Sequence, residues 1–370
     1  MAEVLRAPKG LDGIAVADTR IAKSGADGTL TYRGYAIKDL FDKSSFDESA
    51  FLILKGKLPS KAELADFTAR SRKLSHLPPQ VYQVLRMLPK DAHPMDVLRT
   101  TVSALGTIER GLSPEEQKIS VISKMPSLVV NGYRVVKGER PIEPDESLNQ
   151  GANILYMLRG KAPSSFESWV MERVLILYLE HDLNASAFTV RVVASTLADI
   201  YSACTAGLAA LKGPLHGGAN EAAMKMLAKI GKAEDAKAYV EQLLHAHEKV
   251  MGFGHRIYKE VDPRAQLTKQ LLRRLVSETG KGEELYDLCD AVEKAVWDLK
   301  KLPANVDFYV APVFNILGVP TEIYTPLFAS SRTVGWVAHY NEQIEDNRIY
   351  RPDAVYIGEK GLKYVPLSDR

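Results

Sequence analysis

The chain has 370 residues, enough for about two domains, and its 46% hydrophobic and 25% charged residues are typical of a globular protein. The 48 Lys and Arg residues nearly balance the 46 Asp and Glu residues, and the net charge of +2 excludes the strongly basic surface of nucleic-acid or anionic-membrane binders. The two cysteines form no disulfide framework, and neither a leader-like N-terminus nor a membrane-spanning apolar run is evident, so we expect a cytoplasmic protein.

The N-terminal residues 11–37 are expected to form a small β-hairpin. Two β-leaning runs flank Asp27-Gly28, a pair that is typical of tight turns. Beyond this segment the apolar residues recur with the helical period, and Asp91 is a candidate cap for one of the resulting helices. The period predicts helices over 46–55, 61–74, 79–87 and 93–105.

The central segment predicts two helices of different character. Ser164 or Ser165 can cap the first, which leads toward the polar residues 180–186. Residues 187–211 are rich in Ala, Ser, Thr and Val, which predicts one helix that is buried in the core or at a subunit contact.

A charged helical segment is predicted at about 218–318, inserted into the rest of the chain. After it come an apolar helix at about 326–343 and a last short hairpin at 354–366. The sequence therefore indicates a mainly α protein with small β-hairpins near its two ends.

Residues 249–265 bring together a flexible loop, an imidazole and cations. Gly252 and Gly254 let a ligand approach the backbone closely, and His255 can titrate near neutral pH. Lys259 and Arg264 are candidate anion-binding residues. Asp262-Pro263 marks a turn or a helix start. A surface loop with a chance histidine is the alternative for this segment alone.

Two further segments place polar groups at helix breaks. We expect His216 at the N-terminus of the helix that follows it, where the helix dipole keeps the ring neutral; an exposed loop histidine is the alternative. Asp307 stands between Val306 and Phe308, where lost hydration would make its carboxylate more basic. A helix N-cap is the competing interpretation of Asp307.

Arginines in segments of low charge are candidate anion binders. Arg264, Arg332 and Arg351 lie beside prolines or in such segments, and Arg332 lies on an otherwise apolar helix. A guanidinium there requires a carboxylate or phosphate partner, with an internal salt bridge as the alternative. His245 and His247 point to different helix faces, so no metal site is expected from them.

Taken together, these motifs resemble the citrate synthase family over nearly the whole chain, and their joint occurrence in one order is specific although each is weak alone. The length is similar to that of the short, homodimeric form of many bacteria and archaea. The motifs are Tyr32-Arg33-Gly34-Tyr35, His93-Pro94-Met95-Asp96, Gly213-Pro214-Leu215-His216-Gly217, Gly252-Phe253-Gly254-His255, Asp262-Pro263-Arg264, Asn305-Val306-Asp307-Phe308-Tyr309, Ser331-Arg332 and Arg351-Pro352.

The resemblance implies a two-domain, nearly all-helical fold that closes over its substrates. Residues 1–217 and 319–370 would form the large domain, for dimerisation and oxaloacetate, and 218–318 the small domain, for CoA and the catalytic aspartate. The reaction would condense acetyl-CoA with oxaloacetate and hydrolyse the citryl thioester. It needs neither a cofactor nor a metal.

The resemblance also implies residue roles. Asp307 would remove the methyl proton, His216 would hydrogen-bond the enolate oxygen as a neutral donor, and His255 would protonate the oxaloacetate carbonyl. The oxaloacetate ligands would be His181, His255, Arg264 and Arg332, with Arg351 from the partner subunit. The CoA ligands would be Val250, Met251, Gly252, Phe253, Gly254 and Lys259.

One departure from the family pattern concerns the acyl group. After Tyr309 the family usually carries small polar residues, whereas this chain has Val310-Ala311-Pro312. A 2-methylcitrate synthase that uses propionyl-CoA therefore remains an alternative, because one methylene changes specificity by only about 1–3 kcal/mol. A non-catalytic helical scaffold or CoA-binding protein is the alternative from another class.

Overall fold

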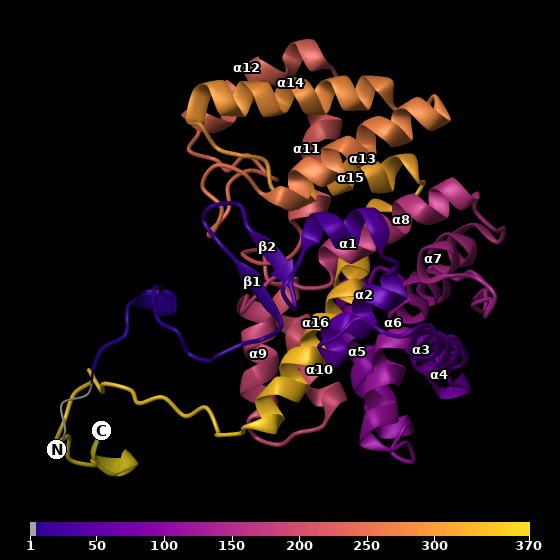
Figure 1. The fold of residues 1–370 in the computed structure, drawn as a ribbon. Coiled ribbons are helices and arrows are strands. Elements are labelled where there is room, and N and C mark those ends of the chain that lie inside the picture. Colours follow the sequence, from indigo (N-terminus) through magenta and orange to yellow (C-terminus); the bar gives the residue numbers. More distant parts are fainter. Residues whose placement is uncertain (1–4) are drawn as a thin grey trace.

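The structure is a computed structural model that describes residues 5–370. The chain is mainly helical, as the sequence predicts, with one small sheet near its N-terminus (Figure 1). No helix within the described residues is both long and apolar enough to cross a membrane.

The sheet has three antiparallel strands in the order β1-β2-β3: β1 Ala22–Ser24, β2 Leu30–Tyr32 and β3 Tyr35–Ala36. The predicted hairpin at Asp27-Gly28 is confirmed, because Ala22 pairs with Tyr32 and Ser24 with Leu30 around that turn. Tyr32 is fully buried and its hydroxyl donates to the carbonyl oxygen of Glu180 at 2.9 Å, which ties the sheet to the end of a central helix.

Most helices pack in one body, in the middle and lower part of Figure 1. They are α1 Ile37–Lys43, α2 Phe46–Lys55, α3 Lys61–Lys73, α4 Pro79–Met87, α5 Pro94–Ile108, α6 Pro114–Val136, α7 Gln150–Arg159, α8 Ser165–Tyr178, α9 Ala185–Ala194, α10 Ile200–Lys212 and α16 Tyr324–Glu345. Helix α16 is buried along most of its length and contacts α2, α5, α6, α8, α9 and α10, so it forms the axis of this body.

The charged segment forms the helices at the top of Figure 1, where α13 and α11 pack on α15 and α12 packs on α14. These helices are α11 Ala219–Ile230, α12 Ala236–His245, α13 Pro263–Thr279, α14 Glu283–Lys300 and α15 Val306–Ile316. Short 3-10 turns occupy Lys9–Leu11, Ala233–Asp235, Thr321–Ile323 and Leu367–Asp369. The domain boundaries at 217/218 and 318/319 remain a prediction.

Local sequence signals explain where several helices begin. Ser164 caps α8 in a capping box: its side chain accepts from the Glu167 N–H, and the Glu167 carboxylate accepts from the Ser164 N–H. The proposed cap of α5 was wrong, because His93 rather than Asp91 caps it and accepts the Met95 N–H on Nδ1 at 3.1 Å.

The single helix predicted over 187–211 was also wrong. The chain leaves α9 after Ala194 and restarts at Ile200, because Leu197 adopts a φ of 63° and the Asp199 side chain caps α10 by accepting the Ser202 N–H at 3.0 Å. An aspartate within a run of small residues was the signal for this break.

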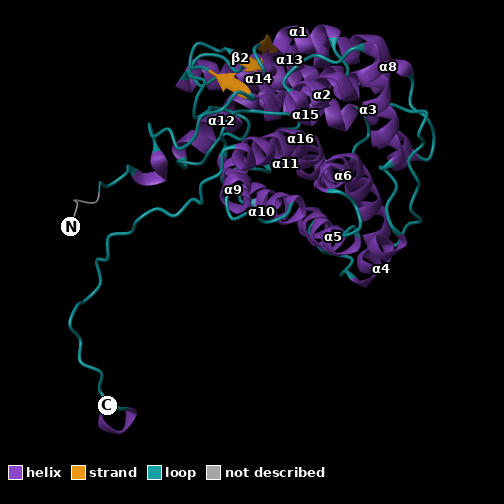
Figure 2. Ribbon diagram, turned by 60° about the horizontal axis from the view of Figure 1, so that its bottom comes forward, coloured by secondary structure: helices purple, strands orange, loops and turns teal. Residues whose placement is uncertain are grey.

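The hairpin predicted over 354–366 does not form, and this described stretch contains no strand. The C-terminal residues instead run away from the helical body as an extended arm (Figure 2). Large apolar side chains are exposed along the arm, including Tyr356, Ile357 and Tyr364. A strand requires a pairing edge, and the arm pairs with none among residues 5–370.

Candidate active site

Asp307 lies in the first turn of α15, at the end of the charged segment. Asn305 is the N-cap of this helix, and its side chain accepts the Asp307 N–H at 3.1 Å. The N-cap interpretation of Asp307 was therefore wrong, and the Asp307 carboxylate instead accepts the Tyr178 hydroxyl on Oδ1 at 2.8 Å. This bond joins α15 to the end of α8, 129 residues earlier in the chain.

Burial raises the pKa of the Asp307 carboxyl above its ordinary value. The hydrogen bond from Tyr178 and the charge of Arg264 oppose this rise without cancelling it. A carboxylate with these surroundings is a stronger base than a solvated one, which suits it to abstract a proton from carbon.

The glycine loop at 250–254 is hydrogen-bonded to the segment that precedes α15. The Gly254 N–H donates to the Pro303 carbonyl at 2.8 Å, and the Asn305 N–H donates to the Gly252 carbonyl at 2.9 Å. Gly252 has a φ of 84°, and a Cβ there would lie 2.7 Å from Cβ of Phe308, so no other residue fits. This pairing fixes the loop, and His255 after it, beside the start of the Asp307 helix.

The His255 ring is held as a neutral donor. Its Nδ1 accepts the backbone N–H groups of Ile257 at 3.1 Å and Tyr258 at 3.2 Å, so the ring proton lies on Nε2. Burial and the charge of Arg264 lower the pKa of His255 to about 4. The ring centroid lies 5.1 Å from that of His181, whose Nε2 is 3.0 Å from the Tyr258 hydroxyl.

His216 is also held neutral, but not by the helix that the sequence suggested. Its Nε2 accepts the backbone N–H of Ser186 at 3.2 Å, in the first turn of α9, and Gly218 rather than His216 caps the following helix α11. The proton of the ring therefore lies on Nδ1. Burial, and next the charge of Arg332, lower the pKa of His216 to about 4.

The lowered pKa values make stability depend on pH. A histidine in the unfolded chain titrates near 6.5, so the neutral rings of His216 and His255 contribute stability above about pH 6.5 and lose it as the pH falls toward about 4. We expect the melting temperature to drop between pH 7 and pH 5 by less in His216→Asn than in the parent protein. Equal drops, measured by circular dichroism, would show that His216 does not have this lowered pKa.

Two buried arginines flank these groups. Arg264 forms a two-point ion pair with Asp262, through Nε to Oδ1 at 3.1 Å and Nη2 to Oδ2 at 2.8 Å. Asp262 also caps α13 and accepts the Val306 N–H at 3.2 Å, so it joins the starts of α13 and α15. The internal salt bridge proposed as an alternative thus exists for Arg264.

Arg332 is different, because its guanidinium forms no ion pair with any side chain of residues 5–370. It is 2% exposed, its Nε donates to the Tyr178 carbonyl at 2.9 Å, and it lies 4.7 Å from the ring centre of Phe328. Burial lowers the pKa of Arg332, and the negative charge of Glu180 partly restores it. A buried guanidinium with free donors is suited to a carboxylate ligand.

The remaining candidates lie outside this cluster. Arg351 is in the C-terminal arm, is 82% exposed and faces Asp353 at 3.7 Å. Lys259 is exposed, and its Nζ donates to the Arg256 carbonyl at 3.1 Å. Among residues 5–370, no group of three or more His, Cys, Asp or Glu side chains is arranged to hold a metal ion.

Sequence reasoning missed three residues that organise the site, Tyr178, Glu180 and Ser186, and it identified Asp262 only as a turn or helix start. Tyr178 contacts Asp307 through its hydroxyl and Arg332 through its carbonyl oxygen, so it links the base to an anion-binding group. The only signal was a tyrosine at the end of the apolar stripe of α8, where its hydroxyl requires a buried partner.

The site thus combines a carboxylate of raised pKa, neutral imidazoles that each present one N–H, and two buried guanidiniums. On a mainly helical scaffold, this defines an enzyme that uses acid–base chemistry on a substrate with carboxylate groups. A family model described as the C-terminal domain of citrate synthase matches residues 10–353, and the chain belongs to the citrate synthase family.

Individual relatives match the chain over nearly all its length. Citrate synthase 2 of Bacillus subtilis is 43% identical and the alignment covers 99% of this chain and 100% of that protein. 2-Methylcitrate synthase of Shewanella oneidensis is 42% identical, with 98% and 97% covered. The structure of citrate synthase from Thermoplasma acidophilum, a ternary complex with carboxymethyl coenzyme A and oxaloacetate, matches with a TM-score of 0.92 at 32% identity, with 98% and 99% covered.

Proposed function

We propose that this chain condenses acetyl-CoA with oxaloacetate and hydrolyses the product thioester to citrate and CoA. The observation that carries the proposal is the half-buried Asp307 carboxylate, whose pKa is raised and whose Oδ1 accepts the Tyr178 hydroxyl. The citrate synthases among its relatives support the same reaction.

The first chemical step removes a proton from the methyl group of acetyl-CoA. Asp307 takes this proton, and the Nδ1–H of His216 donates to the thioester oxygen as negative charge develops there. A neutral imidazole is a suitable donor because it stabilises the enolate oxygen by a hydrogen bond. An imidazolium would instead transfer its proton to that oxygen.

The second step forms the new carbon–carbon bond. The enolate carbon attacks the ketone carbon of oxaloacetate, and the Nε2–H of His255 supplies the proton that the new alkoxide takes up. Water then cleaves the thioester of citryl-CoA, which yields one carboxylate and one thiol. Because early access of water would hydrolyse acetyl-CoA, we expect the glycine loop and α15 to close over the substrates.

Oxaloacetate binding is assigned to His181, His255, Arg264 and Arg332, and the charges of the two arginines act on the base, Asp307. Within one chain, three carboxylates offset the positive charges of the two arginines; they belong to Asp262, Glu180 and Asp307. A dianion therefore needs a further positive charge.

We assign this further positive charge to Arg351 of the partner subunit in a homodimer. The exposed apolar side chains of the C-terminal arm, which carries Arg351, support an intersubunit role. The proposal includes the cytoplasm as location, since Cys204 and Cys289 are both free and buried.

The subunit exchange can be tested by complementation. Co-expressed Arg351→Ala and Asp307→Asn chains form mixed dimers in which one site carries both changes and the other carries neither. With random pairing, about a quarter of all sites should be intact, so thiol release should exceed that of either variant alone. If the mixture instead shows only the average of the thiol-release activities of the two variants measured separately, Arg351 does not act across subunits.

CoA is assigned to Val250, Met251, Gly252, Phe253, Gly254 and Lys259. The hydrogen bonds of the loop to residues 303 and 305 fix its backbone, and Lys259 is an exposed cation nearby in sequence. A single flexible cation and backbone contacts suit the phosphates and adenine of CoA.

The alternative substrate, propionyl-CoA, is kept because a 2-methylcitrate synthase is almost as similar as a citrate synthase. Val310 and Ala311, which depart from the family pattern, are fully buried, so they act on the acyl site only through packing.

Oxaloacetate-dependent thiol release, measured with acetyl-CoA and propionyl-CoA in parallel, tests the proposal. We expect acetyl-CoA to give the larger kcat/KM; release from neither thioester would remove the enzyme assignment in favour of a non-catalytic CoA-binding or scaffold protein.

A further inference from the structure

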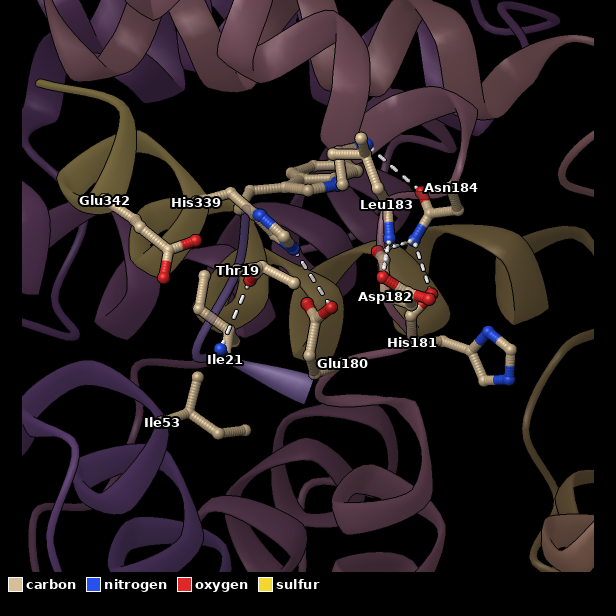
Figure 3. A network of polar contacts seen from close by, with 12 residues as sticks. Thr19, Ile21, Ile53, Glu180, His181, Asp182, Leu183, Asn184, His339 and Glu342 are labelled. Atoms are coloured by element: carbon tan, nitrogen blue, oxygen red, sulfur yellow. Dashed lines mark hydrogen bonds and ion pairs between the residues drawn. The ribbon is translucent and has the colours of Figure 1, made fainter. Parts of the chain in front are cut away.

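The Glu180 carboxylate is a buried acid next to the site that the steps above do not use. It lies between the end of α8 and helix α16, with an exposure of 0% (Figure 3). Its Oε1 is 3.1 Å from Nε2 of His339, whereas its Oε2 has no hydrogen-bond partner among residues 5–370. An unpaired oxygen on a buried carboxylate is costly, so it calls for an explanation.

The contacts of His339 show that Glu180 is not neutralised by this histidine. Nε of Arg191 donates to Nδ1 of His339 at 3.0 Å, and because arginine only donates, Nδ1 must be unprotonated. The ring is therefore neutral, and its single proton, on Nε2, is donated to Glu180. Arg191 in turn is neutralised by the carboxylate of Glu342.

The free oxygen of Glu180 is directed at the helix that carries Arg332. A Cβ on Gly335 would lie 2.0 Å from Oε2 of Glu180, so the carboxylate fits only against a glycine at this position. Gly335 is one helical turn from Arg332, and Arg332 donates to the carbonyl of Tyr178, two residues before Glu180. The negative charge of Glu180 thus acts on the guanidinium through space, without forming an ion pair with it.

We propose that Glu180 is a positioning and charge-balancing residue that acts through Arg332 and limits how tightly the site holds oxaloacetate. The proposal rests on the assignment of Arg332 to oxaloacetate. A fixed negative charge beside a dianion site weakens binding of the dianion, and it weakens binding of the product citrate, with three carboxylates, more strongly. Glu180 therefore promotes product release, at the expense of a higher KM.

Glu180→Gln tests this inference, because the amide can still accept the His339 proton while the charge is lost. We expect oxaloacetate to bind about tenfold more tightly in calorimetry. The KM for oxaloacetate should fall by a similar factor, and kcat should fall as well because citrate leaves more slowly. Loss of a residue that only supports the fold would instead weaken oxaloacetate binding and raise the KM, so the affinity and the KM separate the two roles.

Asp47→Asn is the control, because it removes another buried carboxylate, one on α2 that pairs with Arg72 of α3. It should leave oxaloacetate affinity unchanged. If Glu180→Gln does not fold, the double variant Glu180→Met/His339→Leu replaces the pair by apolar groups and should show the same tenfold gain.

Unchanged or weaker oxaloacetate binding in a folded Glu180 variant would overturn the inference while leaving the proposed function intact. Failure of the parent protein itself to bind oxaloacetate would instead refute the proposed function, and the inference with it.

Discussion

Replacing Asp307 by Asn is expected to lower kcat about a thousandfold, the typical contribution of a positioned general base. Asparagine keeps the shape of the side chain and can still accept the hydrogen bond from Tyr178, so the site should stay assembled. Oxaloacetate affinity should be retained, because Arg264 and Arg332 are unchanged. Single-turnover thiol release and calorimetry on the same preparation separate these two effects.

Asp298→Asn provides the control, since Asp298 is an exposed carboxylate on α14 of the same charged segment. It should show parent activity and parent stability. An Asp307→Asn variant that turns over within a few-fold of the parent would show that another group removes the methyl proton.

Replacing His216 by Ala is expected to lower kcat by about 100- to 1,000-fold, as the loss of one oxyanion donor does elsewhere. The KM for acetyl-CoA should change little, because the Nδ1–H is needed mainly when charge develops on the thioester oxygen. His245→Ala, at an exposed position, is the matched control. A large rise in KM with an unchanged kcat would indicate that His216 binds substrate in the ground state rather than stabilising the enolate.

Much of the fold could be predicted because its signals are local. Asp27-Gly28 marks the hairpin, the serine pair Ser164-Ser165 marks the start of α8, and Asp262-Pro263 marks the start of α13. The errors have local causes too: Asp199 caps a helix inside an otherwise uniform run, and the arm at 354–366 has β-leaning residues but no neighbouring strand to pair with.

The site was predictable only where its residues are unusual for their segment. Asp307 in an apolar run and Arg332 on an apolar helix can be recognised one at a time. Tyr178 and Glu180 could not be recognised, since their importance comes from contacts with Asp307 and with α16, more than a hundred residues away. Likewise, only the structure shows that the N–H facing His216 belongs to Ser186 in α9.

All of the proposed chemistry requires three distant side chains to meet at one reacting carbon. A crystal structure of this protein with oxaloacetate and carboxymethyl coenzyme A bound measures that directly. We expect the Asp307 carboxylate and Nδ1 of His216 to contact the acyl end of the CoA analogue, and Nε2 of His255 to contact the ketone oxygen of oxaloacetate. Ligands bound with any of these three side chains turned away from the reacting atoms would contradict the mechanism.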